Sequence, residues 1–211
     1  MKAIFYLVLI VVFSTCSNNE GKDNTSNPNE EHNLEAAQNS NPGEITDESV
    51  YQLNSTWTTQ DGNKIKLDAL TGKVVVVAMV YTSCEFACPR IVADINRIKK
   101  SIDDKDLDDQ VHFVLVSIDP KVDTPEKLHS FAREYNMSPD DWTLLNGKEG
   151  DILELAALLG VKYKKTTEKD YAHSNIITVL NKQGEIAHQQ VGLAMDPSET
   201  IEEIENLVKK G

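Results

Sequence analysis

Two cysteines, Cys84 and Cys88, have the type and spacing in this chain that best suit chemistry. They stand four positions apart: Cys84 follows the apolar run 74–81 after two residues, and Cys88 directly precedes Pro89. Two thiols at this spacing can close a disulfide, or they can bind one soft metal ion together. The third cysteine, Cys16, belongs to an N-terminal segment with a separate explanation. Cys84 and Cys88 must therefore act with each other or with a partner that is not a thiol.

The elements that position this pair are predicted from the hydrophobic pattern. The run 74–81 is almost wholly apolar and rich in valine, which is typical of a strand covered on both faces. Pro89 fits the first turn of a helix, and isoleucines recur from Ile91 to Ile102 at helical spacing. A second buried strand is expected over 111–118. Thr124 and Pro125 then mark the start of another helix.

The remaining elements complete an α/β domain. We expect an N-terminal hairpin over 53–67, a short strand at 143–145, a helix capped by Asp151 and ended by Gly160, a hairpin over 176–191, and a final helix opened by Pro197 and Ser198. A βαβ unit followed by a ββα unit predicts a thioredoxin-like fold: a central mixed β-sheet flanked by helices, here with an extra N-terminal hairpin.

The redox motif of that fold follows the strand of the first βαβ unit, at a helix N-terminus, which is where Cys84 and Cys88 lie. Because Cys88 is next to Pro89, we expect it to lie near the positive end of the helix dipole. That position would lower the pKa of the Cys88 thiol and favour its thiolate.

A nitrogen ligand would complete a metal site. A structural zinc site needs four ligands, so two cysteines would require two histidines, whereas copper accepts three ligands. Two sulfurs and one nitrogen are therefore the economical expectation. His173 stands in a loop before the strand 176–180, and in a thioredoxin-like fold that loop packs beside the redox motif. The residues leave open whether His173 is a ligand or an ordinary loop histidine. The other histidines are expected to be solvated or structural: His32, His112, His129 and the outward-facing His188.

Three segments resemble, in order, the signature blocks of the Sco/SenC copper proteins. They are 81–89 (YTSCEFACP), 117–125 (SIDPKVDTP) and 170–174 (DYAHS), and the resemblance extends from about Leu53 to the last helix. It implies a membrane-tethered, thioredoxin-like copper protein that serves assembly of the dinuclear copper A centre of cytochrome c oxidase. The partner implied is the oxidase subunit that carries this centre.

The same resemblance implies a ligand set. Cys84, Cys88 and His173 are the implied copper ligands, and Asp119 is implied to lie beside the site without binding the metal. Two departures stand out. Phe86-Ala87 replaces the Val that is common before the second cysteine, and the histidine block is one or two residues shorter than usual.

Two functions from different classes follow from these residues. The first is a metallochaperone that binds Cu(I) or Cu(II), since two thiolates and an imidazole suit both ions. The alternative is an enzyme, a thiol–disulfide oxidoreductase in which Cys84 attacks a substrate disulfide and Cys88 resolves it; a peroxide-reducing version is a further alternative. The enzyme would tolerate loss of His173. A purely structural disulfide is disfavoured because so short a loop gains little from cross-linking.

The N-terminal segment predicts export. Lys2 is followed by the apolar stretch 3–13, which is short for a bilayer span and suits the core of a signal peptide. Cys16 directly afterwards resembles a bacterial lipoprotein cleavage site. We therefore expect residues 1–16 to be a lipoprotein signal with Cys16 lipidated, or an uncleaved N-terminal anchor. The protein would lie in the bacterial cell envelope, attached to the membrane and facing the periplasm or the exterior.

Composition divides the rest of the chain. Residues 17–50 carry eight acidic residues against one lysine and few large apolar residues, which predicts a disordered acidic linker. Residues 51–211 are long enough for one domain with a core. The net charge of the whole chain is −13, with no basic cluster, which argues against nucleic-acid binding.

Overall fold

A computed structural model of the protein describes residues 45–168 and 170–210. The predicted signal at 1–16 and most of the predicted linker at 17–50 lie outside these residues. The last residues of that linker already pack on the domain: Ser49 and Val50 are buried, and the Val50 N–H donates to the carbonyl oxygen of Gly184 at 3.0 Å. The packed part of the chain thus begins a few residues before position 51.

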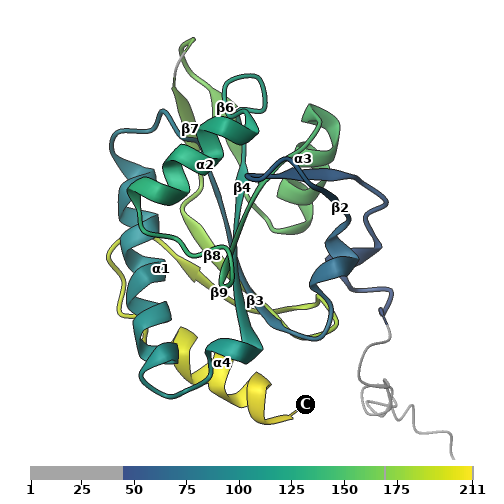
Figure 1. The fold of residues 1–211 in the computed structure, drawn as a ribbon, viewed down its shortest axis with the longest axis vertical. Helices are drawn as coiled ribbons and strands as arrows, with labels where there is room; N and C mark the ends of the chain where they lie inside the picture. Colours follow the sequence, from purple (N-terminus) through teal and green to yellow (C-terminus); the bar gives the residue numbers. More distant parts are fainter. Residues whose placement is uncertain (1–44, 169, 211) are drawn as a thin grey trace, which may run out of the picture. The chain divides into compact units, whose positions relative to one another are not determined.

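A seven-stranded mixed sheet forms the centre of the domain (Figure 1). The strand order is β2-β1-β5-β4-β3-β8-β9, with β3, β4 and β5 parallel and the other neighbours antiparallel. Within the described residues, the strands are β1 Trp57–Thr59, β2 Lys64–Ile65, β3 Val74–Val80, β4 Val111–Ser117, β5 Trp142–Asn146, β8 Ile176–Leu180 and β9 Ile186–Val191. A separate pair, β6 Tyr163–Lys165 and β7 Tyr171–His173, forms a second small antiparallel sheet.

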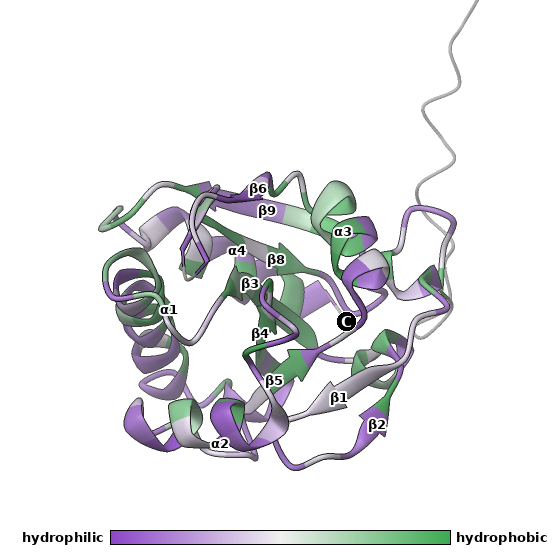
Figure 2. Ribbon diagram, turned by 90° about the horizontal axis from the view of Figure 1, so that it is seen from above, coloured by the Kyte–Doolittle hydropathy of each residue, from purple (hydrophilic) through white to green (hydrophobic). Residues whose placement is uncertain are grey.

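Four α-helices flank the central sheet in the described part of the chain. They are α1 Ala87–Asp103, α2 Pro125–Glu134, α3 Glu149–Leu158 and α4 Ser198–Lys210, and short 3-10 helices span Val50–Gln52, Leu67–Leu70 and Asp108–Gln110. Helices α1 and α4 contact each other and β3, whereas α2 contacts β5 and β1. Helix α3 lies on the opposite side of the sheet from α1 (Figure 2). The predicted thioredoxin-like fold, with its N-terminal hairpin, is confirmed.

The core explains why β3 and β4 carry apolar side chains on both faces. Every residue of β3 is buried, and β4 is buried except for the half-buried His112. The isoleucines of α1 at 91, 95, 98 and 102 are at most 1% exposed, as their helical spacing predicts. Burial of a side chain of this size contributes roughly 1.5–3 kcal/mol. This packing holds the first turn of α1 against the carboxyl end of β3. No helix among the described residues is long and apolar enough to cross a bilayer.

Three local predictions differ from the structure. Helix α3 begins at Glu149 after Lys148, so Asp151 lies inside its first turn and does not cap it. Ile186 is 41% exposed while His188 is half-buried against the Thr200 hydroxyl, the reverse of the predicted alternation, because a bulge shifts the register of β8 and β9. His173 lies in strand β7, not in a loop.

Candidate metal centre

Cys84 lies in the turn that connects β3 to α1. The turn is closed by the Cys84 N–H, which donates to the Tyr81 carbonyl oxygen at 3.2 Å. Hydrogen bonds also connect this turn to the segment between β4 and α2. The buried Asp123 carboxylate accepts hydrogen bonds from the Thr82 N–H at 3.1 Å and from the Thr82 hydroxyl at 2.5 Å. Cys84 is half-buried, so its sulfur is held in place and still partly open.

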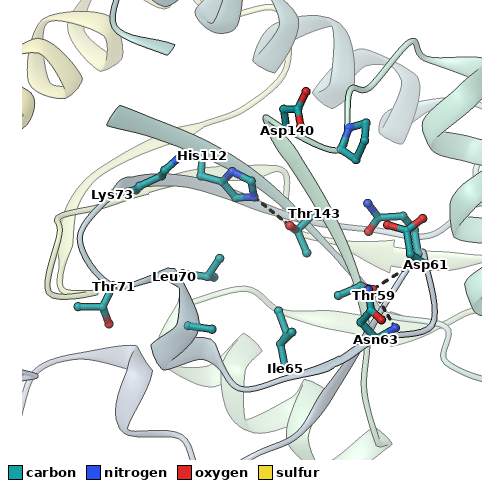
Figure 3. Close-up of a pocket in the computed structure, with 13 residues that line it drawn as sticks. Thr59, Asp61, Asn63, Ile65, Leu70, Thr71, Lys73, His112, Asp140 and Thr143 are labelled. Atoms are coloured by element: carbon teal, nitrogen blue, oxygen red, sulfur yellow. Dashed lines mark hydrogen bonds between the residues drawn. The ribbon is translucent and has the colours of Figure 1, made fainter. Parts of the chain in front are cut away.

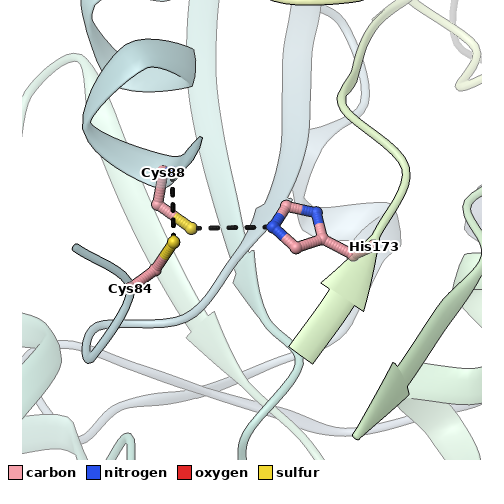
Figure 4. Close-up of side chains that lie close together, drawn as sticks. All are labelled: Cys84, Cys88 and His173. Atoms are coloured by element: carbon pink, nitrogen blue, oxygen red, sulfur yellow. Dashed lines mark hydrogen bonds between the residues drawn. The ribbon is translucent and has the colours of Figure 1, made fainter. Parts of the chain in front are cut away.

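Cys88 lies in the first turn of α1 and is fully buried. The N-cap residue, Phe86, makes no capping hydrogen bond with its side chain. The Cys84 sulfur instead accepts a hydrogen bond from the Cys88 N–H at 3.3 Å. Cys84 thus occupies the place of a capping group in front of the helix. The Cys88 sulfur points from the helix toward His173 (Figure 4).

His173 reaches the cysteines from the β6–β7 hairpin, 85 positions after Cys88 in the chain. Its Nδ1 lies 3.0 Å from the Ser174 carbonyl oxygen, which can only accept, so Nδ1 carries the proton. Its Nε2 lies 3.9 Å from the Cys88 sulfur. This arrangement leaves the lone pair of Nε2 directed at the two sulfurs, as a metal ligand requires.

Aromatic contacts hold the histidine hairpin against the cysteine turn. The Tyr81 hydroxyl accepts a hydrogen bond from the Tyr171 N–H at 3.3 Å, and the two rings lie 5.2 Å apart. The Tyr81 ring also packs edge-on against the His173 imidazole at 5.9 Å. Burial raises the pKa of Tyr81 to about 12, so its hydroxyl stays neutral. Tyr81 therefore connects the two segments that carry the candidate ligands.

Cys84, Cys88 and His173 form a compact donor set (Figure 4). One donor atom from each lies within 4.8 Å of the others, and no other cluster of three such residues occurs within 45–168 and 170–210. Two thiol sulfurs and one imidazole nitrogen suit soft and borderline ions such as Cu(I), Cu(II) and Zn(II). The same two sulfurs are close enough in sequence and space to react with each other.

The two thiols differ in acidity, and the order is opposite to the prediction. Burial by itself raises the pKa of Cys84, but hydrogen bonds from the Cys88 and Phe86 N–H groups, the Cys88 thiol and the Tyr81 hydroxyl lower the pKa further than burial raises it. The pKa of Cys88 is raised, mainly by burial and also by the charge of Cys84. Helix N–H groups stabilise the sulfur in front of them, which belongs to Cys84, and not a sulfur turned into the core.

Asp119 lies beside this site without joining the donor cluster. It is 2% exposed, and its N–H donates to the Ser117 hydroxyl at 3.0 Å. The pKa of Tyr171 is raised to about 12, first by burial and then by the charge of Asp119 and a hydrogen bond to Asp119. Asp119 therefore contacts the aromatic pair that holds the histidine hairpin, in keeping with its expected place next to the ligands.

The remaining described histidines lie elsewhere. Because β3 and β4 are parallel, His112 near the start of β4 is at the opposite end of the sheet from Cys84. There it contacts the Thr143 hydroxyl at 2.9 Å and lines a cavity of about 400 Å³ (Figure 3). His129 is exposed next to Asp61, and His188 contacts Thr200. His32 lies outside the described residues.

Two residues that shape the site were missed from the sequence, Asp123 and Tyr81. Both stand inside the segments that carry the family resemblance, 117–125 and 81–89. An acidic residue four positions after Asp119 was a visible signal for a buried contact, but its partner Thr82 is 41 positions away. Thr82 and Asp123 meet only because the segment after β3 packs against the segment after β4.

The fold and the site define a class: thioredoxin-like proteins whose cysteine pair at a helix N-terminus is joined by a histidine into a candidate metal centre. The family model SCO1/SenC matches residues 45–209. This chain therefore belongs to the SCO1/SenC family, as the three sequence segments indicate.

Individual relatives agree with this assignment. The SCO1 protein homolog of Bacillus subtilis (strain 168) is 28% identical over 162 residues, which cover 75% of this chain and 83% of the relative. The structure of BsSco, a member of the Sco family of cytochrome c oxidase assembly proteins with an identified disulfide switch, matches with a TM-score of 0.67 and 25% identity. That match covers 76% of this chain and 95% of BsSco. The structure of Arabidopsis thaliana ScoI with copper bound matches with a TM-score of 0.64 and 22% identity, over 72% and 96% of the two chains.

Proposed function

We propose that this protein binds copper through Cys84, Cys88 and His173 and serves the assembly of the copper A centre of cytochrome c oxidase. The observation that carries the proposal is the donor cluster, in which three ligand atoms from β3–α1 and β7 lie within 4.8 Å. Membership of the SCO1/SenC family and the copper-bound Arabidopsis relative support copper over other soft ions. The partner is the oxidase subunit that receives the metal.

Copper is the cargo in this proposal, so the site must release it as well as bind it. The half-buried Cys84 offers a sulfur that a thiol of the partner can approach, whereas Cys88 is closed off from solvent. Three ligands also leave a copper ion open to one more donor. Transfer would then proceed by ligand exchange that begins at Cys84.

Copper titration of the full-length chain tests the proposal. The chain would carry Cys16→Ser, which leaves Cys84 and Cys88 as its only thiols, and would be kept reduced in mild detergent. Cu(I) would be titrated against a competing chelator. We expect one copper per chain, binding at least about tenfold weaker in His173→Ala and lost in Cys84→Ser.

A matched control is His129→Ala, which removes an exposed histidine that contacts Asp61 and lies outside the donor cluster. It should bind copper like the parent chain. Copper binding that is indifferent to His173→Ala, or no competitive binding at all, would overturn the proposed site and favour thiol exchange.

Thiol–disulfide exchange is the second candidate function, and one observation favours it. The two sulfurs differ as an attacking and a resolving thiol should: Cys84 is half-open with a lowered pKa, and Cys88 is buried with a raised one. Reduction of a disulfide substrate that survives His173→Ala but not Cys84→Ser would establish this activity. A metal site alone would lose its function in both variants.

We further propose that the N-terminus attaches the domain to the membrane of the bacterial cell envelope through a lipid on Cys16. The apolar stretch 3–13 followed by Cys16 supports this, and an uncleaved anchor is the alternative. Metabolic labelling with a radioactive fatty acid distinguishes the two. Label that disappears in Cys16→Ser indicates lipidation, and membrane-bound protein without label indicates the anchor.

A further inference from the structure

A groove of about 940 Å³ opens beside the candidate metal centre, and Cys84 is the one ligand that lines it. Cys88 and His173 are not among its lining residues. We call this hollow the Cys84 groove. Its walls come from the cysteine turn, from α2 and the segment before it, and from the residues before β7. A molecule in the groove would therefore meet the Cys84 sulfur first.

Apolar and aromatic side chains form part of the groove. Phe86, between the two cysteines, is 66% exposed and is the most exposed large hydrophobic residue among the described ones. Its ring lies under the Arg90 guanidinium at 3.9 Å. Phe131 and Tyr135 line the groove from α2 and the residue after it, with their rings 4.6 Å apart. An exposed aromatic residue next to a reactive sulfur is typical of a surface that contacts another protein.

The charge of the groove is strongly acidic. Among its described lining residues, Glu85, Asp119, Glu134, Glu168 and Asp170 face a single cation, Lys127. Glu85 and Glu134 are exposed and can meet a charged partner; in the sequence Glu85 directly precedes Phe86, and Glu134 directly precedes Tyr135. A field of one sign in a concave surface attracts ligands of the opposite charge.

Asp119 adds an independent sign that a ligand belongs here. This carboxylate is 2% exposed, and its Oδ2 has no hydrogen-bond partner among the described residues. A buried carboxylate oxygen without a partner is costly, on the order of 1–3 kcal/mol or more. A cationic or hydrogen-bonding group that entered the groove could supply the missing partner.

We infer that the Cys84 groove is a docking site for a protein segment in which a cysteine is flanked by lysine or arginine residues. The inference deepens the proposed function, on which it rests, by naming the chemistry of the partner. Positive side chains meet Glu85, Glu134 and Asp119, the apolar part of the segment covers Phe86, and the partner's sulfur is brought to Cys84. The groove selects the partner by charge, and Cys84 receives its sulfur before Cys88 does.

The test uses two peptide probes of equal length, each with one cysteine held as a mixed disulfide with thionitrobenzoate. One probe flanks the cysteine with lysines and the other with glutamates. The Cys84 thiolate attacks the peptide sulfur, a new disulfide forms, and thionitrobenzoate leaves with the electron pair as a coloured ion. Cys88 then displaces the peptide as a thiol, so that the protein dithiol is oxidised and the probe is reduced.

The protein would be the full-length reduced chain with Cys16→Ser, free of metal, in mild detergent. Rates would be divided by those of the same probes with neutral 2-mercaptoethanol, which removes the intrinsic reactivity of each probe. We expect the lysine probe to react about tenfold faster than the glutamate probe at low salt. The ratio should approach one in about 0.5 M salt, where charges are screened over a few ångströms.

Charge reversal in the groove identifies the surface. Glu85→Lys combined with Glu134→Lys should remove or invert the preference, and the neutral pair Glu85→Gln with Glu134→Gln should give an intermediate value. Glu202→Lys, an exposed residue of α4 outside the groove, is the matched control and should leave the preference unchanged. Equal rates for both probes, or a preference that Glu202→Lys reduces as much as the groove variants do, would overturn the inference.

The outcome is separable from that of the copper proposal because no metal takes part in the probe reaction. The groove variants retain all three candidate ligands and should bind Cu(I) like the parent chain. Normal copper binding with no probe preference would refute the docking site alone. A probe preference without copper binding would refute the metal site alone.

Discussion

The Asp123 carboxylate accepts two hydrogen bonds from Thr82: Oδ2 lies 3.1 Å from the Thr82 backbone nitrogen, and Oδ1 lies 2.5 Å from the Thr82 hydroxyl. The Ser117 hydroxyl donates to the same carboxylate at 2.6 Å. This group, fully buried, joins the carboxyl ends of β3 and β4. It thereby fixes the turn in which Cys84 presents its sulfur.

Substitution of Asp123 should disturb both the fold and the site. Asp123→Asn replaces one acceptor oxygen by a donor that faces the hydroxyl or N–H groups, so we expect a loss of about 2–3 kcal/mol in the free energy of unfolding. Copper affinity of the folded protein should fall about tenfold because Cys84 is less well positioned. Denaturant unfolding and Cu(I) competition measure the two effects.

Two further variants make this result interpretable. Thr82→Val removes one hydroxyl and retains the N–H, and should cost about 1 kcal/mol. Asp109→Asn alters an exposed carboxylate and should change stability by less than about 0.5 kcal/mol. If the free energy of unfolding and the copper affinity of Asp123→Asn equal those of the parent chain, Asp123 does not position Cys84.

Cys84 should be the reactive thiol of the reduced, metal-free protein. The hydrogen bonds that lower its pKa make it a thiolate at lower pH than a free cysteine, whose pKa is about 8.5. Iodoacetamide labelling followed over pH by mass spectrometry should modify Cys84 with a midpoint below that value. The buried Cys88 should react only when the protein unfolds. Labelling of Cys88 before Cys84 in the folded protein would contradict the structure.

His112 should make the protein less stable in acid. Burial, with a smaller contribution from Lys73, lowers the pKa of His112 to about 4. In the unfolded chain its pKa is about 6.5. Between these values the unfolded state binds the proton and the folded state does not. The stability that depends on neutral His112 is therefore fully present above pH 6.5 and is lost as the pH falls to 4.

A fall in pKa from about 6.5 to about 4 corresponds to about 3.4 kcal/mol, and because His112 is only half-buried, screening by solvent reduces the expected loss to about 2 kcal/mol. Urea unfolding at pH 7, 5.5 and 4 measures it, and His112→Gln should flatten that part of the pH profile. His129→Gln, at an exposed site, should leave the profile as it is. An unchanged profile in His112→Gln would show that another group causes the acid sensitivity. Figure 3 shows the cavity in which His112 lies.

Gly147 should not tolerate a side chain. A Cβ at this position would lie 2.6 Å from the Trp57 ring, which is fully buried and whose indole N–H donates to Ser55 at 2.8 Å. Because this ring has little room to move, Gly147→Ala should cost about 1–3 kcal/mol in the free energy of unfolding. Gly150→Ala is the matched control, since nothing lies within 4 Å of its Cβ.

The control should be neutral or stabilise α3 by up to about 1 kcal/mol, since alanine is a better helix former than glycine. Thermal or denaturant unfolding of both variants measures the contrast. Equal stability of the two variants would show that Trp57 can move out of the way.

The sequence by itself determined the elements and the chemistry that they carry. Unbroken apolar runs identify β3 and β4, isoleucines at helical spacing identify α1, and the cysteine pair between β3 and α1 is a local signal. An apolar run or a helical repeat lies within one short segment, so the sequence of that segment is enough to predict a buried strand or a helix. The three segments 81–89, 117–125 and 170–174 were enough to predict the family.

The tertiary structure decided which atoms meet. The β6–β7 hairpin was not predicted, because strands of three residues leave little periodic pattern, yet it turns His173 Nε2 toward the sulfurs. The sequence also indicated the wrong cysteine as the more acidic one. Helix N–H groups act on the sulfur that faces them, and the direction of a side chain depends on packing. Asp123 likewise contacts a segment far away in the chain, and the acidic Cys84 groove is lined by three such segments. Only the packing of the core brings these segments together.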